Sequence, residues 1–153
     1  MWTWKKCTAI IFWRNMADPL RILVDLNVAL DVVQKREPFY ADSADVLDAV
    51  ANKRVVGFLA AHSITTLFYV LRRQYDRPTA VFVTRQILDA FSIAPVDDTV
   101  IRQALAWGWR DFEDAAQMAA AVHANLDYLV TRNPKDFQTQ PVPILRPAHL
   151  LPL

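Results

Sequence analysis

Residues 21–27 read RILVDLN, and this short stretch indicates the fold class of the chain. Its apolar, β-rich run is typical of a buried strand, and it stops at Asp25, directly before residues with helical spacing. Further apolar runs at residues 55–60, 93–96 and 127–131 also lie between stretches of helical spacing. Apolar runs that alternate with helices predict a parallel sheet covered by helices on both faces.

The segments between these strands share apolar residues at three- and four-residue intervals, which predicts helices. Pro78 suits the first turn of one helix, and Asp97 begins a capping segment before another. The helices are expected at residues 27–34, 39–52, 64–75, 78–91, 100–107 and 112–125. A further strand at residues 143–145 is expected at the edge of a sheet of four to five strands.

The domain organisation follows from length and composition. With 153 residues, of which 54% are hydrophobic, the chain is expected to form one folded domain over residues 19–153. Residues 1–18 are interpreted as an N-terminal extension that mixes tryptophans with basic residues. It is either a poorly packed tail, with translation starting at Met1 or Met16, or an anchor for a membrane surface or partner. Its apolar run at residues 7–13 is too short to span a bilayer.

The net charge of +1 gives the whole molecule no strong attraction for nucleic acid. A nucleic-acid partner would therefore need local basic groups, for which the sequence offers Arg72, Arg73, Arg77 and Arg85, although these also suit an ordinary solvated surface. The single cysteine, Cys7, excludes an internal disulfide and is typical of a reducing compartment, so a cytoplasmic protein is expected.

Polar and acidic residues follow the predicted strands and begin one helix. Asp25 ends the first strand, Asn133 and Asp136 follow the fourth, and Asp111 and Asp114 begin the helix at residues 112–125. The carboxyl ends of parallel strands share one edge of the sheet, where ligands bind. Carboxylates gathered there repel one another unless a cation lies between them. We therefore expect one acidic pocket that is assembled from distant parts of the sequence.

Each acid also has a simpler interpretation. Asp25 suits the cap of the next turn, Asp136 suits a surface turn, and Asp111 and Asp114 suit the positive end of a helix. Taken together, Asp25, Asp114 and an acid after the fourth strand match the oxygen ligands that Mg²⁺ prefers. A metal ion held there polarises a phosphoryl oxygen and activates water for phosphodiester hydrolysis.

Other chemistries find less support. The histidines, His62, His123 and His149, lack cysteine partners and zinc-binding spacing, and Ser63 has no signature of a nucleophile around it. With two glycines in the whole chain, phosphate-binding glycine loops are excluded. The tryptophans at positions 107 and 109 suit either core packing or a base-stacking surface beside the pocket.

Several motifs, taken in order, resemble those of the PIN-domain family, the fold of VapC-type toxins. They are DLN at residues 25–27, ITTLFYVLRR at 64–73, DFEDA at 111–115 and VTRNPKDF at 130–137. The resemblance covers roughly residues 20–150. It implies a three-layer α/β/α fold, a site that binds Mg²⁺ or Mn²⁺, and metal-dependent cleavage of single-stranded RNA.

The resemblance also implies roles for individual residues. Asp25 would be the first metal ligand, with Asn27 orienting it or its water. Asp114 would be the main acid of the third motif, with Asp111 an accessory metal ligand. Asn133 and Asp136 would act near the water or a second ion.

The second motif of the family usually supplies an acid where this chain has Thr66. A threonine hydroxyl supplies no negative charge, so metal binding would be weakened. The resemblance therefore leaves two interpretations open: a ribonuclease toxin that dimerises and pairs with an antitoxin, or a catalytically inactive module that binds RNA or protein. A phosphohydrolase for small molecules is disfavoured, because Asn27 stands where such an enzyme has a second aspartate.

Overall fold

Five parallel strands form the central sheet in the computed structural model, which describes residues 18–151. The spatial order is β3-β2-β1-β4-β5, so β1 lies at the centre and β5 at an edge, as predicted. The strands are β1 (Arg21–Val24), β2 (Val56–Ala60), β3 (Ser92–Ala94), β4 (Tyr128–Val130) and β5 (Ile144–Leu145). The predicted extension, residues 1–18, lies outside the described residues except for Asp18.

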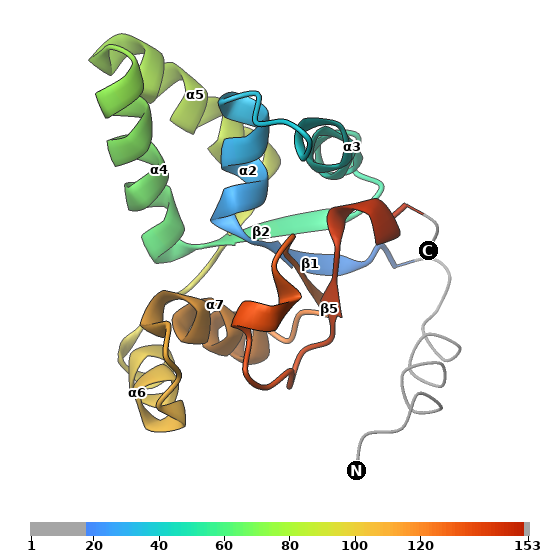
Figure 1. Ribbon diagram of the computed structural model, residues 1–153, viewed down its shortest axis with the longest axis vertical. Coiled ribbons are helices and arrows are strands. Elements are labelled where there is room, and N and C mark those ends of the chain that lie inside the picture. Colours follow the sequence, from blue (N-terminus) through green and yellow to red (C-terminus); the bar gives the residue numbers. More distant parts are fainter. Residues whose placement is uncertain (1–17, 152–153) are drawn as a thin grey trace.

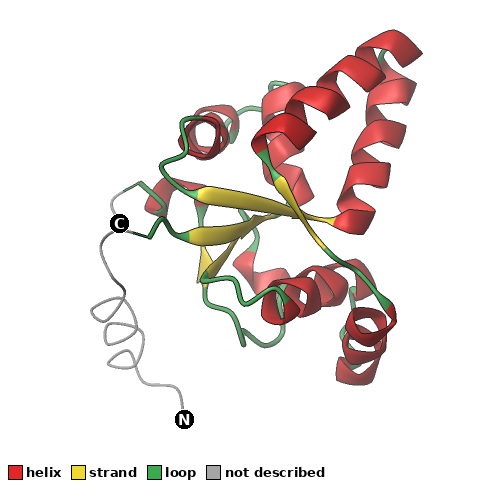
Figure 2. Cartoon of the chain, turned by 180° about the vertical axis from the view of Figure 1, so that it is seen from behind, coloured by secondary structure: helices red, strands yellow, loops and turns green. Residues whose placement is uncertain are grey.

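Helices cover both faces of the sheet and give the three-layer α/β/α arrangement that the sequence predicts (Figure 1). One face carries α2 (Leu26–Val33), α3 (Tyr40–Ala51), α4 (Ala61–Gln74) and α5 (Arg77–Ala90). The other face carries α6 (Asp98–Trp107) and α7 (Phe112–His123), and Figure 2 shows the strands between these two groups. Short 3₁₀ turns, η1 (Pro134–Asp136) and η2 (Pro147–His149), flank β5.

The central strand is buried on both faces, which explains its uninterrupted apolar sequence. Ile22 and Val24 pack into the core beneath α2 to α5, whereas Leu23 packs into the core beneath α6 and α7. The second core is rich in alanine from α7, whose small side chains let that helix lie close to the sheet.

The register of the sheet brings distant segments together. Val24 of β1 pairs with Val130 of β4, so the residues that follow them, Asp25 and Thr131, emerge side by side at the carboxyl edge. Asp25 forms the N-cap of α2, because the chain turns from strand into helix without a loop.

Helix α4 differs from its predicted bounds. It begins at Ala61, three residues before the predicted start at Ile64, because Ala60 ends β2 and caps the helix at once. Residues 61–63 are therefore helical, and His62 lies in the first turn. The other elements end or begin within two residues of their predicted bounds. Within the described part of the chain, no helix is both long and apolar enough to cross a membrane.

Candidate functional site

Asp25 is the most buried acid of the predicted pocket, with only 4% of its surface exposed. Its carboxylate accepts hydrogen bonds from the Asn27 backbone N–H at 3.2 Å and from the Thr131 hydroxyl at 2.8 Å. The Gln117 side-chain amide donates a third, at 3.3 Å. Asp25 therefore does cap a helix, but it also accepts bonds from two other elements, and all of these donors are neutral. Its negative charge lacks a cationic partner among the bonds found in the described residues.

Helix α7 brings the next acids to the same edge. Asp111 is its N-cap and accepts hydrogen bonds from the backbone N–H groups of Glu113, at 2.9 Å, and Asp114, at 3.2 Å. One turn further on, the Gln117 amide nitrogen lies 3.4 Å from the Asp114 carboxylate as well as 3.3 Å from that of Asp25. A single amide thus bridges two acids that are far apart in the sequence.

The pKa of Asp114 reflects the acids that surround it. Burial, and then the charges of Asp111, Asp25, Asp136 and Glu113 in that order of size, together raise the pKa of its carboxyl to about 7. Four other carboxyl groups thus act on Asp114: two from the start of α7, one from the end of β1 and one from η1. At neutral pH, a carboxyl with this pKa readily exchanges its proton for a cation.

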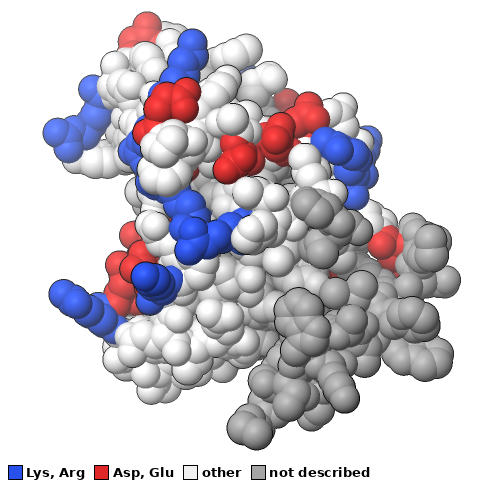
Figure 3. All heavy atoms as spheres, turned by 45° about the vertical axis from the view of Figure 1, so that its right-hand side comes forward, with Lys and Arg blue, Asp and Glu red and all other residues white. Residues whose placement is uncertain are grey.

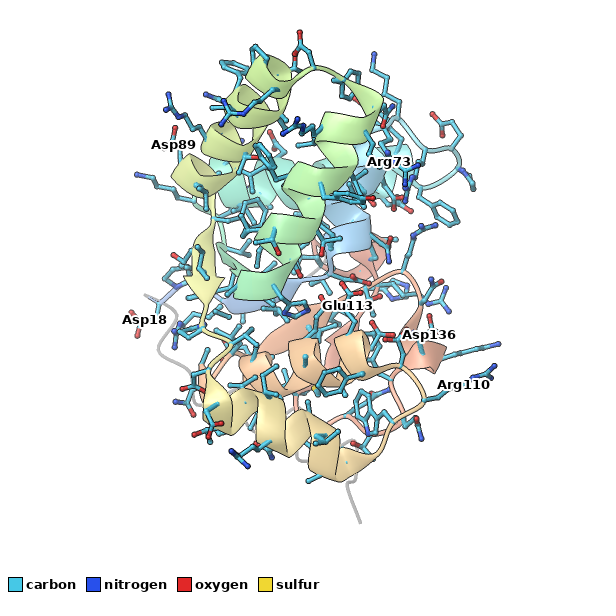
Figure 4. The ribbon with its side chains drawn as sticks, turned by 90° about the vertical axis from the view of Figure 1, so that its left-hand side faces the viewer. Asp18, Arg73, Asp89, Arg110, Glu113 and Asp136 are labelled. Atoms are coloured by element: carbon cyan, nitrogen blue, oxygen red, sulfur yellow. The ribbon has the colours of Figure 1, made fainter. Side chains whose placement is uncertain are left out.

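The segment after β4 supplies the outer part of the site. Asp136 is exposed in η1, and Asn133 is exposed with its backbone N–H donating to the Thr131 hydroxyl at 3.2 Å. Asp136 and Asp111 border a cavity of about 550 Å³, and Figure 4 shows Asp136 and Arg110 on the same side of the molecule. The cavity is lined by Arg110, Asp111, Lys135, Asp136 and Gln138. Asp25 and Asp114 do not line it, although Asp111 at its border also acts on Asp114.

Helix α4 contributes no acid. The Thr66 hydroxyl donates to the His62 carbonyl at 3.3 Å, an ordinary bond within its own helix. The sequence did not predict that His62 would lie near the acids at the start of α7. Burial lowers the pKa of its imidazole, while the charge of Glu113 partly opposes this shift. Figure 4 shows Glu113 at the start of α7, close to the first turn of α4.

A second buried acid, Asp31, was also missed. It is fully buried in α2, accepts a hydrogen bond from Ser43 at 3.2 Å, and lies 3.3 Å from the Arg132 guanidinium. Burial raises the pKa of Asp31, although Arg132 and Arg36 lower it in part. The sequence did contain a signal for this residue. Asp31 is the single acid in the apolar helix LNVALDVV, and a buried acid must have a partner.

The residues at the centre of the site fit a divalent cation. In the described part of the chain, no three acidic, histidine or cysteine side chains are grouped tightly enough to form a metal site on their own. Mg²⁺ nevertheless needs only one or two carboxylates, because water fills its other positions. Asp25 and Asp114 are the two carboxylates that could supply this need, and the Gln117 carbonyl oxygen is a buried oxygen without a hydrogen-bond partner in the described structure.

The predicted aromatic and basic surfaces are arranged differently from expectation. Trp109 is 8% exposed and stacks on Trp107 at 5.3 Å within the core, so packing accounts for its position and a base-stacking role does not. Figure 4 shows Arg73 on α4, well away from Asp136 and Arg110. Figure 3 shows basic and acidic side chains interspersed on the visible face. The cations beside the acids are instead Arg110 and Lys135.

Solved structures similar to this chain come from bacterial toxins. A toxin–antitoxin complex from Klebsiella pneumoniae has a TM-score of 0.64 at 21% identity, covering 82% of this chain and 97% of that one. VapBC-1 from nontypeable Haemophilus influenzae has a TM-score of 0.66 at 11% identity, with coverages of 84% and 98%. VapC20 from Mycobacterium tuberculosis, a toxin that cleaves the sarcin–ricin loop, has a TM-score of 0.57 at 18% identity, with coverages of 71% and 86%.

Identities this low establish a shared fold and nothing further. Among curated proteins, none matches the chain significantly. The family profile of the PIN domain, in contrast, matches residues 21–135, a span that includes Asp25, Asp114 and the start of the segment after β4. By that match, the chain belongs to the PIN-domain family, as its motifs predict.

Proposed function

We propose that this protein is a metal-dependent endoribonuclease that cleaves single-stranded RNA. The observation that carries the proposal is the meeting of Asp25 and Asp114 on one amide, at the carboxyl edge of a parallel sheet. Family membership supports the same class, since one similar structure belongs to a toxin that cleaves the sarcin–ricin loop. Among divalent ions, Mg²⁺ and Mn²⁺ suit the carboxylate oxygens of the site.

Asp25 and Asp114 would hold the ion, and Asp111 would assist from the N-cap of α7. When bound, Mg²⁺ or Mn²⁺ would supply positive charge that polarises the phosphoryl group and makes water more acidic. The Thr131 hydroxyl and the Asn27 backbone N–H hold the Asp25 carboxylate in place, which fixes the geometry of the site before substrate arrives.

The residues around the cavity and after β4 would bind the substrate and orient water. Arg110 and Lys135 line the cavity beside the acids, where their positive charges would contact backbone phosphates and make RNA binding weaken with salt. Asp136 and Asn133 are exposed at the same edge and would orient the attacking water through hydrogen bonds. Arg72, Arg73, Arg77 and Arg85 lie on the α4–α5 hairpin and are less suited to this purpose.

The similar structures also suggest partners. Those from Klebsiella pneumoniae and Haemophilus influenzae are toxin–antitoxin assemblies, so we propose an antitoxin that covers the acidic site of this protein. A basic side chain from that partner would neutralise the same carboxylates as the metal ion does. A homodimer in the cytoplasm completes the proposal.

The test is RNA decay in Mg²⁺ or Mn²⁺ with wild type and Asp114→Asn. We expect the variant to be at least 100-fold slower, because an amide lacks the charge that the ion requires. Asp89→Asn is a matched control, since Asp89 is exposed on α5 and lies far from Glu113 and Asp136 in Figure 4. Equal decay by wild type and Asp114→Asn would overturn the catalytic assignment.

One observation favours a second candidate, a PIN-like module that binds RNA or protein without cleaving it. Thr66 supplies no carboxylate, and its hydroxyl is bonded within its own helix. The two candidates separate in one experiment with fluorescent single-stranded RNA. Binding that persists in Mg²⁺ and in Mn²⁺ without any cleavage would select the binding module, whereas cleavage in either ion would exclude it.

A further inference from the structure

Gln117 is the side chain that connects the acids of the site. It lies on α7 with 2% of its surface exposed, and its amide nitrogen contacts both Asp25 and Asp114. Its carbonyl oxygen is buried and finds no hydrogen-bond partner among the described residues. In a buried amide, both the nitrogen and the oxygen normally form hydrogen bonds. Here only the nitrogen does, so the unpaired oxygen calls for an explanation.

The arrangement suits a site without metal. Two carboxylates that face one another repel, and the N–H groups of Gln117 place partial positive charge between them. The amide nitrogen therefore stands where a cation would otherwise stabilise the pair. A half turn of the terminal amide exchanges its nitrogen and oxygen, and the oxygen would then face the carboxylates. A cation between the acids would make that orientation favourable.

The site has no acid on α4, and the Thr66 hydroxyl donates within its own helix. Gln117, whose amide nitrogen contacts both Asp25 and Asp114, carries a buried carbonyl oxygen without a hydrogen-bond partner among the described residues. Amide oxygens are accepted ligands for hard divalent cations, although they bring no charge.

We propose that Gln117 is a metal ligand that also preserves the empty site. Its nitrogen bridges Asp25 and Asp114 when no metal is bound, and its oxygen binds the ion when Mg²⁺ or Mn²⁺ enters. The amide thus replaces, as a neutral ligand, the acid that Thr66 does not provide. This inference rests on the proposed function, because it requires a divalent ion between the same two carboxylates.

The test uses Mn²⁺ titration calorimetry on wild type, Gln117→Met and Gln117→Glu. Methionine keeps the length of the side chain but removes the hard oxygen, so we expect Mn²⁺ affinity to fall at least tenfold. Glutamate replaces the neutral oxygen with a charged one, so we expect affinity at least equal to that of wild type. Gln86→Met, on the exposed surface of α5, is the control and should bind Mn²⁺ like wild type.

The possible outcomes distinguish the ligand role of Gln117 from the proposed nuclease function. Normal Mn²⁺ affinity in Gln117→Met would overturn the ligand role while leaving the nuclease site intact. No Mn²⁺ binding in wild type would overturn both. If Gln117→Met does not fold, the decision comes from wild-type protein labelled with ¹⁵N at glutamine side chains. We expect the buried Gln117 amide signal to move on addition of Mg²⁺, and an unmoved signal in Mg²⁺-bound protein would refute the role.

Discussion

Asp25 and Asp31 are both buried carboxylates associated with helix α2, yet their surroundings differ in charge. Asp31 is fully buried and lies 3.3 Å from the guanidinium of Arg132 and 3.9 Å from that of Arg36. Asp25 is 4% exposed and receives hydrogen bonds from neutral donors, while its charge also raises the pKa of Asp114. Asp31 thus has two arginine partners, whereas Asp25 has none among the described contacts and its charge also helps to raise the pKa of Asp31.

The difference separates a structural acid, Asp31, from an acid that we propose to be functional, Asp25. A buried charge is tolerated when it is paired, and Asp31 follows that rule with two arginines. Asp25 and Asp114 depart from it, which is expected where a cation completes the site. Both acids meet the segment after β4, because Thr131 contacts Asp25 and its neighbour Arg132 contacts Asp31. The ion pair between Asp31 and Arg132 thus holds in place the segment whose Thr131 hydroxyl orients Asp25.

The largest effect on stability should follow from breaking the ion pair between Asp31 and Arg132. Asp31→Ala leaves the half-buried Arg132 without its partner, and we expect a loss of about 3 kcal/mol in the free energy of unfolding, measured with urea. Asp98→Ala is the control, because its ion pair with Arg102 is exposed and should cost less than about 1 kcal/mol. Equal losses in both variants would contradict the structural role of Asp31.

Burial of Asp114 and the charges of the acids around it should make the metal-free protein less stable as pH rises. The pKa of Asp114 is raised to about 7 in the folded protein, from 3.8 for an ordinary aspartate. Its stabilising contribution is therefore complete below pH 4 and is lost as pH increases toward 7. We expect a loss on the order of 2 kcal/mol after allowance for solvent.

Urea unfolding in EDTA over this pH range measures the effect, and Asp114→Asn should remove most of the slope. An unchanged slope in that variant would show that other groups cause it. A divalent ion should restore the lost stability at pH 7 and above, because it binds the ionised carboxylates.

A smaller effect is expected where a neutral donor holds Asp25. Thr131→Val keeps the shape of the buried side chain but removes the hydroxyl that donates to Asp25 and accepts from the Asn133 backbone. We expect a loss of about 1 kcal/mol in unfolding free energy, measured with urea. Thr65→Val is the comparison, since Thr65 is exposed on α4, and it should be nearly neutral. A neutral result at Thr131 would mean that its hydroxyl does not hold Asp25.

The sequence predicted the sheet, because each strand is a short apolar run with a helix on either side. It also predicted which acids lie at the carboxyl edge, because parallel strands must share that edge. It did not predict the start of α4, because no turn residue separates β2 from the helix. The contacts of Gln117 with Asp25 and of Arg132 with Asp31 were equally hidden, since each joins residues far apart in the chain.

The most direct test of the central claim is calorimetric titration of Mn²⁺ into wild type, Asp25→Asn and Asp31→Asn at pH 7.5. If Asp25 is the uncompensated acid and Asp31 the paired one, we expect wild type to bind and Asp25→Asn to lose binding by at least tenfold. Folded Asp31→Asn should keep an affinity close to that of wild type. Binding that survives in Asp25→Asn, or that is absent from wild type, would contradict the account.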